Sequence, residues 1–224
     1  MSEVSMVSIV IPALNEAGTI GETINTIRES IKYPHEIIVV DGNSTDDTQE
    51  IVRKAGCKLI IEPRRGYGLA LKVGMKNAKG EIIVIVDGDG TYEVKDVNRL
   101  IDTLVNERAD LCLAARKFLD EKSMDLPNYV GNKIITLLFN ILYHQQLTDT
   151  QSGFRAIRRS AIENTRLKED DMAFATEMLI QFSKKGYKIV EVPTSYKPRK
   201  YGKSKLKRLK AGLEILKVLF TGLK

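Results

Sequence analysis

Residues 81–92 read EIIVIVDGDGTY, and this stretch is the strongest indication of fold class in the sequence. Five consecutive isoleucines and valines, residues 82–86, are typical of a strand buried on both faces of a parallel sheet. The run leads directly into two aspartates separated by one glycine, Asp87 and Asp89. Ligands of open parallel sheets bind beyond the carboxyl ends of the strands, so these two carboxylates indicate a site for a polar ligand.

Similar apolar runs alternate with helical patterns through the first half of the chain. We expect strands at residues 7–13, 36–42, 57–63, 81–89 and 109–118, and helices at residues 17–31, 46–55 and 68–78. Alternation of this kind predicts right-handed crossovers and an α/β fold, with a mostly parallel, Rossmann-like sheet flanked by helices.

The pattern changes after residue 118. We expect helices at residues 130–145 and 171–185, irregular structure between them at 147–162, and a late strand at 187–196. Because the sequence contains no internal repeat or linker, residues 1–224 are expected to form a single catalytic domain. Its parts would be a nucleotide-binding half (1–118), an acceptor half (119–202) and a C-terminal helix (203–224).

Composition restricts the class of protein. Hydrophobic residues make up 43% and charged residues 29% of the 224 residues, the ordinary mixture of a soluble globular protein. The first residues lack a basic start followed by an apolar core, so we expect no secretory leader. Cys57 and Cys112 are expected to be free thiols in a reducing compartment, the cytoplasm.

Three of the expected strands end in groups that suit a polar ligand: Pro12, Asn15 and Glu16 follow the first strand, Asp41 the second, and Asp87 with Asp89 the fourth. Mg²⁺ or Mn²⁺ binds one or two carboxylates together with the phosphates of a substrate, so a glycine turn with two aspartates suits either ion. A divalent ion there would neutralise a diphosphate leaving group. The spacing alone leaves an alternative open, in which the aspartates only cap a helix or shape a turn.

Three segments occur in a diagnostic order and spacing: VSIVIPALNEAGTI (7–20), EIIVVDGNSTDDT (36–48) and EIIVIVDGDGTY (81–92). Together they resemble the family 2 glycosyltransferases, which have a GT-A fold and an Asp-X-Asp metal motif. The likeness continues through PRRGYGLALKVGMKNAKG (63–80), TDTQSGFRAIRR (148–159), FATEMLIQFSKKGYKIVEVP (174–193) and PRKYGKSKL (198–206). It covers nearly the whole chain and looks strongest toward dolichyl-phosphate mannosyl- and glucosyltransferases, which use polyprenyl-phosphate acceptors.

The resemblance assigns roles to the strand-end residues. It implies a nucleoside pocket formed by Pro12, Asn15, Glu16 and Asp41, with Asp41 at the base and Glu16 at the ribose or base. Asp87 would lie near the ribose or sugar and assist Asp89, the more direct metal ligand. Two departures leave the base open. Asp41-Gly42 stands where relatives often have two aspartates, and RRGYGLA (64–70) lacks the lysine of the related glycine-rich segment.

Phosphate binding is expected from glycines and basic residues. Gly66 and Gly68 would allow close approach of the backbone to a ligand, or would simply begin a helix. Arg116 and Arg199 could bind phosphate through two parallel hydrogen bonds, although an exposed arginine is often only solvated. The resemblance makes RKYGKSK (199–205), which includes Lys205, a phosphate-binding loop, with Ser204 as a plausible N-cap of the following helix.

The resemblance further implies an inverting transfer, in one displacement, of a hexose from GDP-mannose or UDP-glucose. A polyprenyl phosphate needs no general base, because its oxygen is already anionic near neutral pH. A hydroxyl acceptor would need one, and Asp149 is then the candidate. Asp149 could instead brace its loop, in a pair with Arg155.

The C-terminal segment is strongly basic. Residues 199–224 contain nine Lys or Arg and one acid, Glu214, a net charge of +8, whereas the whole chain carries +6. Apolar residues recur there at helical spacing: Leu206, Leu209, Leu213, Leu216 and Phe220. A basic amphipathic helix of this kind could dock on the cytoplasmic face of an anionic membrane, or could pack its leucines against the domain. Residues 130–143 are apolar nearly all round, a pattern that predicts either a core helix or a second interfacial helix.

Two other classes of protein fit the sequence less well. A nucleotidyltransferase usually has a glycine-rich, basic loop after its first strand, but PALNEAGTI (12–20) has one glycine and no basic residue. A nucleic-acid-binding module is suggested by the sequence pI of about 9.2, yet it would place stacking aromatics among the basic residues. The tail has few, and the strand-end acids would be unexplained, so we expect no nucleic-acid partner.

Overall fold

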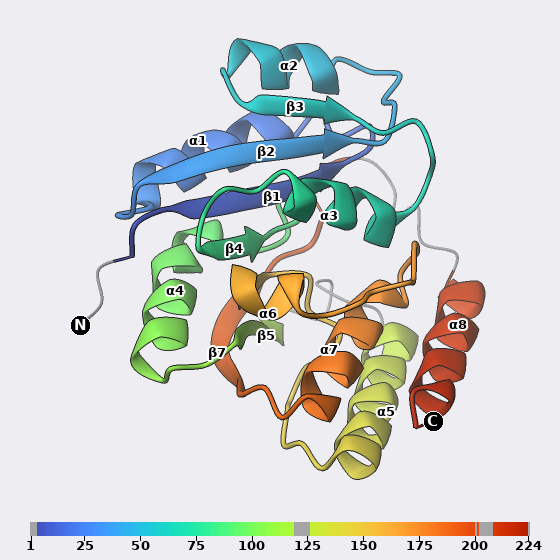
Figure 1. Ribbon diagram of the computed structural model, residues 1–224. Coiled ribbons are helices and arrows are strands. Elements are labelled where there is room, and N and C mark those ends of the chain that lie inside the picture. Colours follow the sequence, from blue (N-terminus) through green and yellow to red (C-terminus); the bar gives the residue numbers. More distant parts are fainter. Residues whose placement is uncertain (1–3, 119–125, 200, 202–207, 224) are drawn as a thin grey trace.

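The computed structural model describes residues 4–118, 126–199, 201 and 208–223. Within these residues the strands form one seven-stranded sheet with the order β3-β2-β1-β4-β6-β5-β7 (Figure 1). The strands are β1 (Val7–Ala13), β2 (His35–Asp41), β3 (Lys58–Ile61), β4 (Ile82–Ile85), β5 (Leu111–Phe118), β6 (Arg155–Arg158) and β7 (Ile189–Tyr196). Every pairing is parallel except those of β6, which runs antiparallel to both β4 and β5. The mostly parallel sheet expected from the sequence is confirmed.

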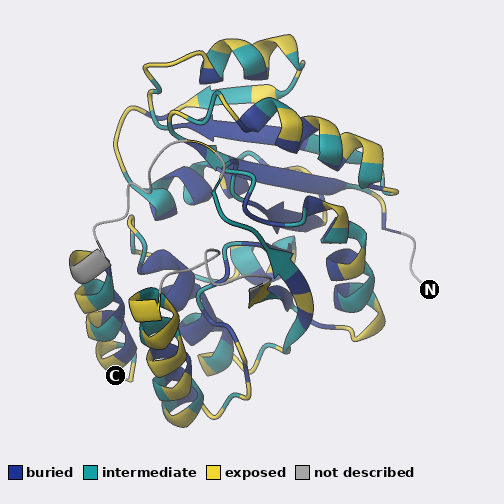
Figure 2. Cartoon of the chain, turned by 180° about the vertical axis from the view of Figure 1, so that it is seen from behind, coloured by how far each residue is buried: buried dark blue, intermediate teal, exposed yellow. Residues whose placement is uncertain are grey.

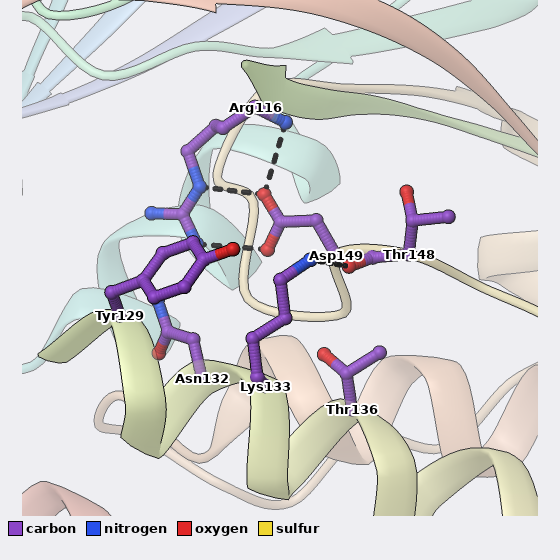
Figure 3. Close-up of a pocket in the computed structure, with 7 residues that line it drawn as sticks. All are labelled: Arg116, Tyr129, Asn132, Lys133, Thr136, Thr148 and Asp149. Atoms are coloured by element: carbon purple, nitrogen blue, oxygen red, sulfur yellow. Dashed lines mark hydrogen bonds and ion pairs between the residues drawn. The ribbon is translucent and has the colours of Figure 1, made fainter. Parts of the chain in front are cut away.

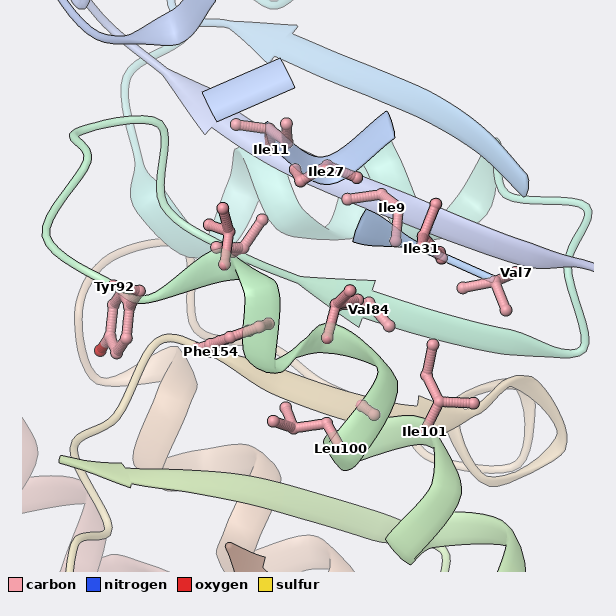
Figure 4. Close-up of a cluster of buried hydrophobic side chains, with 14 of the residues drawn as sticks. Val7, Ile9, Ile11, Ile27, Ile31, Val84, Tyr92, Leu100, Ile101 and Phe154 are labelled. Carbon is pink, nitrogen blue, oxygen red and sulfur yellow. The ribbon is translucent and has the colours of Figure 1, made fainter. Parts of the chain in front are cut away.

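Helices cover both faces of this sheet. They are α1 (Ile20–Ser30), α2 (Thr48–Lys54), α3 (Tyr67–Lys76), α4 (Val97–Asn106), α5 (Leu126–Tyr143), α6 (Arg159–Glu163), α7 (Phe174–Lys184) and α8 (Arg208–Thr221), with a 3₁₀ turn at Val94–Asp96. On one face, Ile9 of β1 packs with Ile27 of α1 and Leu100 of α4 (Figure 4). On the other, Val10 of β1 belongs to a second cluster, formed with α3, α5, α7 and α8. Successive residues of β1 thus enter opposite cores, as the uninterrupted apolar run predicts.

Several elements depart from the expectation, among them strand β6 and helix α4. Strand β6 lies where irregular structure was expected, because a four-residue strand flanked by arginines gives almost no sequence signal and is completed by hydrogen bonds to strands on both sides. Helix α4 was not anticipated, although Val97, Leu100, Ile101 and Leu104 recur at helical spacing and are buried. Strand β4 ends at Ile85, so Asp87 and Asp89 lie on the turn that follows it.

Helices α5, α7 and α8 pack against one another beside the sheet (Figure 1). The hydroxyl of Tyr143 in α5 donates a hydrogen bond of 2.6 Å to the carbonyl of Leu219 in α8, which fixes the two helices side by side. Figure 2 shows that both helices keep exposed residues on their outer side. None of the helices within the described ranges combines the length and the hydropathy needed to cross a bilayer.

We predict that Gly74→Ala destabilises the protein, because α3 lies directly on the sheet at this glycine. An added Cβ would come within 2.3 Å of Val10 Cγ1 and 3.2 Å of Val40 Cγ2. Overpacking of this kind typically costs about 1–3 kcal/mol of unfolding free energy. The measurement is denaturant unfolding, with Gly131→Ala in α5 as the control, since a Cβ there meets nothing within 4 Å. Equal unfolding free energies for the two variants would contradict the prediction.

Candidate active site

The loops that follow β1 and β2 hold each other in place. Asn15 has a positive φ of 51°, and its Oδ1 accepts a hydrogen bond of 2.8 Å from the backbone N–H of Thr45. The N–H of Asn15 donates to Ser44 Oγ at 2.8 Å, and the N–H of Glu16 donates to Thr48 Oγ1 at 2.8 Å. These bonds fix the backbone that presents the Glu16 carboxylate at the strand end.

Asp41 is fully buried at the end of β2, in register with Ala13 of β1. Its Oδ1 accepts hydrogen bonds of 2.8 Å from the backbone N–H of Ser44 and from Gln49 Nε2, and its Oδ2 accepts one from the Ser44 hydroxyl. The carboxylate therefore organises the loop between β2 and α2, and through Ser44 it supports Asn15.

The turn after β4 places Asp87 in a closely packed environment. Its Oδ1 accepts a hydrogen bond of 3.1 Å from the phenol of Tyr67, the first residue of α3. A Cβ on Gly153 would lie 2.6 Å from Asp87 Oδ2, so any side chain at that position would collide with the carboxylate. Burial of the carboxylate, together with repulsion from Asp89, raises the pKa of Asp87 to about 7. The turn therefore gains stability from a nearby cation.

Arg199 supplies such a cation. Its Nη2 lies 2.7 Å from Asp89 Oδ2, and its Nη1 lies 3.1 Å from both carboxylate oxygens of Glu16. The second oxygen of Asp89 accepts hydrogen bonds from Thr91, 3.1 Å from the backbone nitrogen and 2.7 Å from the hydroxyl. One guanidinium thus joins the turn after β4 to the loop after β1.

A second arginine forms a separate, buried ion pair. Arg116, near the end of β5, binds Asp149 through two parallel contacts, Nε–Oδ2 at 2.6 Å and Nη2–Oδ1 at 2.8 Å (Figure 3). Burial by itself raises the pKa of Asp149, but the hydrogen bonds and charge of Arg116 outweigh it and hold that pKa below its usual value. The expected pair of Asp149 with Arg155 is wrong, because Arg155 donates instead to the carbonyls of Thr150, Ser152 and Ala175.

A small pocket lies beside this ion pair, between α5 and the loop before β6 (Figure 3). Its lining is polar and includes two basic residues: Arg116, Tyr129, Asn132, Lys133, Thr136, Thr148 and Asp149. Lys133 Nζ donates to the carbonyl of Thr148 at 3.2 Å and lies 5.6 Å from the centroid of the Tyr129 ring. Because Asp149 neutralises Arg116, the lining carries one net positive charge, that of Lys133.

The structure brings some of the expected site residues together and separates others. Glu16, Asp89 and Arg199 are in direct contact, whereas Arg116 and Asp149 form their own pair. Gly66 has a φ of 155° and precedes α3, where a Cβ would come within 2.5 Å of the carbonyl of Asp170, so the glycine is required for packing. Lys205 and Ser204 lie outside the described residues. Within the described ranges, no group of three or more His, Cys, Asp or Glu gathers to hold a metal.

Sequence reasoning did not assign roles to Tyr67, which donates a hydrogen bond to Asp87, or to Gly153, where any side chain would collide with Asp87. The signals were present in the segments RRGYGLA (64–70) and TDTQSGF (148–154). Tyr67 occurs in the glycine-rich segment, which departs from the family by lacking the expected lysine. Burial raises the pKa of Tyr67 well above its usual value, so the phenol stays protonated and donates to the carboxylate.

A mostly parallel sheet covered by helices, with acidic residues at the ends of neighbouring strands, defines an α/β protein with an acidic carboxyl edge, which is where proteins of this class bind their ligands. Residues 8–166 match the family model of Glycosyl transferase family 2, and the chain therefore belongs to this family of transferases. The resemblance stated from the sequence is confirmed.

Curated relatives from Haloferax volcanii support this assignment. Glycosyltransferase AglJ is 34% identical over 199 residues, which are 88% of this chain and 64% of that protein. Low-salt glycan biosynthesis hexosyltransferase Agl6 is 32% identical, over 86% of this chain and 48% of that protein. The chain therefore spans about two thirds or less of these two relatives. The protein named dolichyl-phosphate hexose transferase is 30% identical, over 93% of this chain and 90% of that protein.

Solved structures confirm the GT-A-type fold. Glucosyl-3-phosphoglycerate synthase from Mycobacterium tuberculosis, in complex with phosphoglyceric acid, has a TM-score of 0.78 at 22% identity, over 98% of this chain and 80% of that one. The same enzyme in complex with Mn²⁺, UDP and glucosyl-3-phosphoglycerate has a TM-score of 0.77 at 21% identity, with the same coverage. At these identities the likeness establishes the fold alone.

We predict that Asp149→Asn lowers stability, because it leaves the buried Arg116 guanidinium without its counter-charge. Breaking one partner of a buried ion pair costs about 3–5 kcal/mol of unfolding free energy. The folded-state pKa of Asp149 is depressed, so its contribution is complete above the unfolded carboxyl pKa of about 3.9 and is lost as the pH falls below it. Urea unfolding is measured at pH values from 7 to 3. The difference in unfolding free energy between wild type and variant should shrink below about pH 4. A difference that is independent of pH would contradict this account.

Proposed function

We propose that the protein is an inverting glycosyltransferase that moves a hexose from GDP-mannose or UDP-glucose to a polyprenyl phosphate such as dolichyl phosphate. The observation that carries the proposal is the contact of Arg199, from the segment after β7, with the acidic strand ends at Glu16 and Asp89. A site for a metal–diphosphate thereby lies against a basic segment suited to an anionic acceptor. The relative named dolichyl-phosphate hexose transferase supports the acceptor class.

The donor is proposed to occupy the first half of the domain. Its nucleoside would lie against the strand ends and the neighbouring glycine-rich segment: Pro12, Asn15, Glu16, Asp41 and Gly66. The metal, Mg²⁺ or Mn²⁺, would be held by Asp89 with Asp87 assisting. The residues present fit such an ion, since partly buried carboxylates already gather around a cation, and these ions bind few carboxylates when substrate phosphates complete the shell. A bound metal supplies neutralisation of the leaving diphosphate, and one neighbouring enzyme binds Mn²⁺ together with UDP.

The acceptor phosphate is proposed to bind at the pocket lined by Arg116 and Lys133. Lys205, which lies outside the described residues, is proposed as a further phosphate-binding residue. A polyprenyl phosphate attacks with an oxygen that is already anionic, so these residues have to position it and need not remove a proton. The rival reading is a hydroxyl acceptor with Asp149 as general base. The geometry favours the phosphate, because both oxygens of Asp149 are bound by Arg116 and its pKa is depressed.

The exposed apolar side chains of α5 and α8 support a peripheral membrane location on the cytoplasmic face. On α5, Leu137 and Ile141 are 59% and 60% exposed, and on α8, Leu213 and Phe220 are 69% and 53% exposed. The two helices lie side by side, and Figure 2 shows exposed residues along the outer side of each. Together with the basic charge of residues 199–224, they would hold the domain against an anionic bilayer, where the lipid acceptor resides.

We predict that Asp89→Asn removes transfer activity. The loss of a carboxylate ligand to a catalytic metal costs several kcal/mol of transition-state stabilisation, hence a rate lower by roughly two or more orders of magnitude. Transfer is followed with radiolabelled GDP-mannose or UDP-glucose, Mg²⁺ or Mn²⁺, and either a polyprenyl phosphate or a polyprenol. Asp47→Asn, at an exposed residue in the loop after β2, is the matched control. Activity within about twofold of wild type for Asp89→Asn would remove the proposed metal role, and transfer to the polyprenol alone would favour the hydroxyl acceptor.

We predict that the double variant Leu137→Glu/Ile141→Glu binds membranes much more weakly. Each apolar side chain that enters the bilayer interface contributes about 1–2 kcal/mol, so the loss of two lowers partitioning by tenfold or more. Co-sedimentation with vesicles of anionic or neutral lipids, at low and high salt, measures the effect. Ile61→Glu, on an exposed residue of β3, is the control for added negative charge. Equal co-sedimentation of the double variant and the control at low salt would refute the proposed docking surface.

A further inference from the structure

Arg199 makes contacts that a phosphate ligand alone would not need. Its guanidinium contacts both oxygens of Glu16 and the Oδ2 atom of Asp89, residues 183 and 110 positions earlier in the chain. The Oδ1 atom of Asp89 is taken by Thr91, so Oδ2 is the oxygen that an exchangeable cation would use. The Arg199 side chain is only 24% exposed, so this contact is not a casual surface pair. The guanidinium therefore occupies the position beside Asp89 Oδ2 at which the proposed metal would bind.

The residues on either side of Arg199 hold it over the site. The backbone N–H of Lys197 donates to the carbonyl of Thr91 at 2.8 Å, and its ammonium lies 2.7 Å from Glu93. The ring of Tyr201 lies against Gly18, where an added Cβ would come within 2.8 Å of the ring. The segment is thus anchored both to the residues after Asp89 and to the loop after Glu16.

We propose that Arg199 occupies the cation position of the donor site until the metal and nucleotide bind, so that Arg199 and the metal exclude each other at Asp89. This inference rests on the metal role of Asp89 proposed above. Mutual exclusion follows from charge and from space. A divalent ion on Oδ2 cannot share it with a guanidinium at 2.7 Å, and two cations at one carboxylate repel each other.

Exchange also gives the displaced guanidinium a destination. A bound nucleoside diphosphate brings new phosphate oxygens next to Asp89, and a planar guanidinium binds phosphate as well as carboxylate. A metal that binds alone therefore breaks the ion pair of Arg199 with Asp89 and leaves the guanidinium without an anionic partner. A metal that binds together with a nucleoside diphosphate supplies the diphosphate as the new partner. Arrival of the donor would thus move Arg199, the first residue of the proposed phosphate-binding loop, from the carboxylates to the diphosphate.

The experiment measures binding of Mn²⁺ alone to the full-length chain, from the loss of the free-ion signal in electron paramagnetic resonance. We expect Arg199→Gln to bind Mn²⁺ roughly tenfold more tightly than wild type, and to bind GDP or UDP with Mg²⁺ roughly tenfold more weakly. Tighter binding of the metal together with weaker binding of the nucleotide is the result that distinguishes exchange from a simple loss of charge. Lys188→Gln, which removes the same charge from an exposed pair at the opposite end of β7, should change either affinity by less than about twofold.

A second measurement reports the movement itself. The chain contains no tryptophan, so Tyr201→Trp introduces a single fluorophore against Gly18. Titration with Mg²⁺ and GDP or UDP, which avoids the paramagnetic quenching by Mn²⁺, should give a saturable change in emission. The change should disappear when Asp89→Asn is added, and thermal unfolding of each variant checks that it is folded.

The outcomes separate this inference from the function on which it rests. Unchanged Mn²⁺ affinity in Arg199→Gln would overturn the exchange, even if transfer activity falls, and would leave the proposed transferase intact. Equal Mn²⁺ binding by Arg199→Gln and by Arg199→Gln/Asp89→Asn would overturn both the exchange and the metal role of Asp89. If Arg199→Gln fails to fold, Arg199→Lys replaces it. One ammonium cannot span two carboxylates as the guanidinium does, so tighter Mn²⁺ binding by Arg199→Lys supports the exchange and wild-type affinity overturns it.

Discussion

The gathering of acidic side chains at the carboxyl ends of β1 and β4 is the constraint on which the site depends. Burial of Asp87 and its repulsion from Asp89 raise the pKa of Asp87, which expresses the cost of two negative charges on this turn. Glu16 adds a further acid beside Asp89, because both carboxylates contact the guanidinium of Arg199. A cation has to be supplied. The chain provides one from Arg199, and this requires residues 91–93 to reach the end of β7, where Tyr92 bridges to Tyr196 and Lys197 bonds to Thr91.

The other buried charge in this region is neutralised differently. Asp149 and Arg116 neutralise each other through two parallel contacts inside the protein, which leaves Lys133 to supply the net charge of the pocket beside them. Arg199, in contrast, sits at the edge of its site and pairs with two separate carboxylates, a geometry that a smaller and more highly charged ion can replace. One arrangement suits a fixed part of the scaffold and the other suits a site that has to change partners.

Much of the fold was predictable because β1, β2 and β4 are continuous runs of isoleucine and valine that only a sheet covered on both faces can bury. Strand β6 was not, since its state depends on hydrogen bonds to two strands that are distant in sequence. The same holds for the site. The strand-end acids could be read from their position, but the Arg116–Asp149 pair joins residues 33 positions apart, and an alternative partner, Arg155, lay closer in sequence.

Helix α8 illustrates how a sequence pattern can identify a helix and still combine residues from different faces of it. The expected row includes Leu216, which packs against the domain beside Ala211, Ile215, Val218 and Leu219. It also includes Leu213 and Phe220, which are 69% and 53% exposed, so the described part of the row is divided between a packed side and an exposed side. Packing and the proposed membrane docking, which the sequence allows on different faces, would use different sides of the same helix. The exposed Leu213 and Phe220 leave apolar surface in water, which is unfavourable. Contact with a lipid surface would bury the same side chains and make their free-energy contribution favourable.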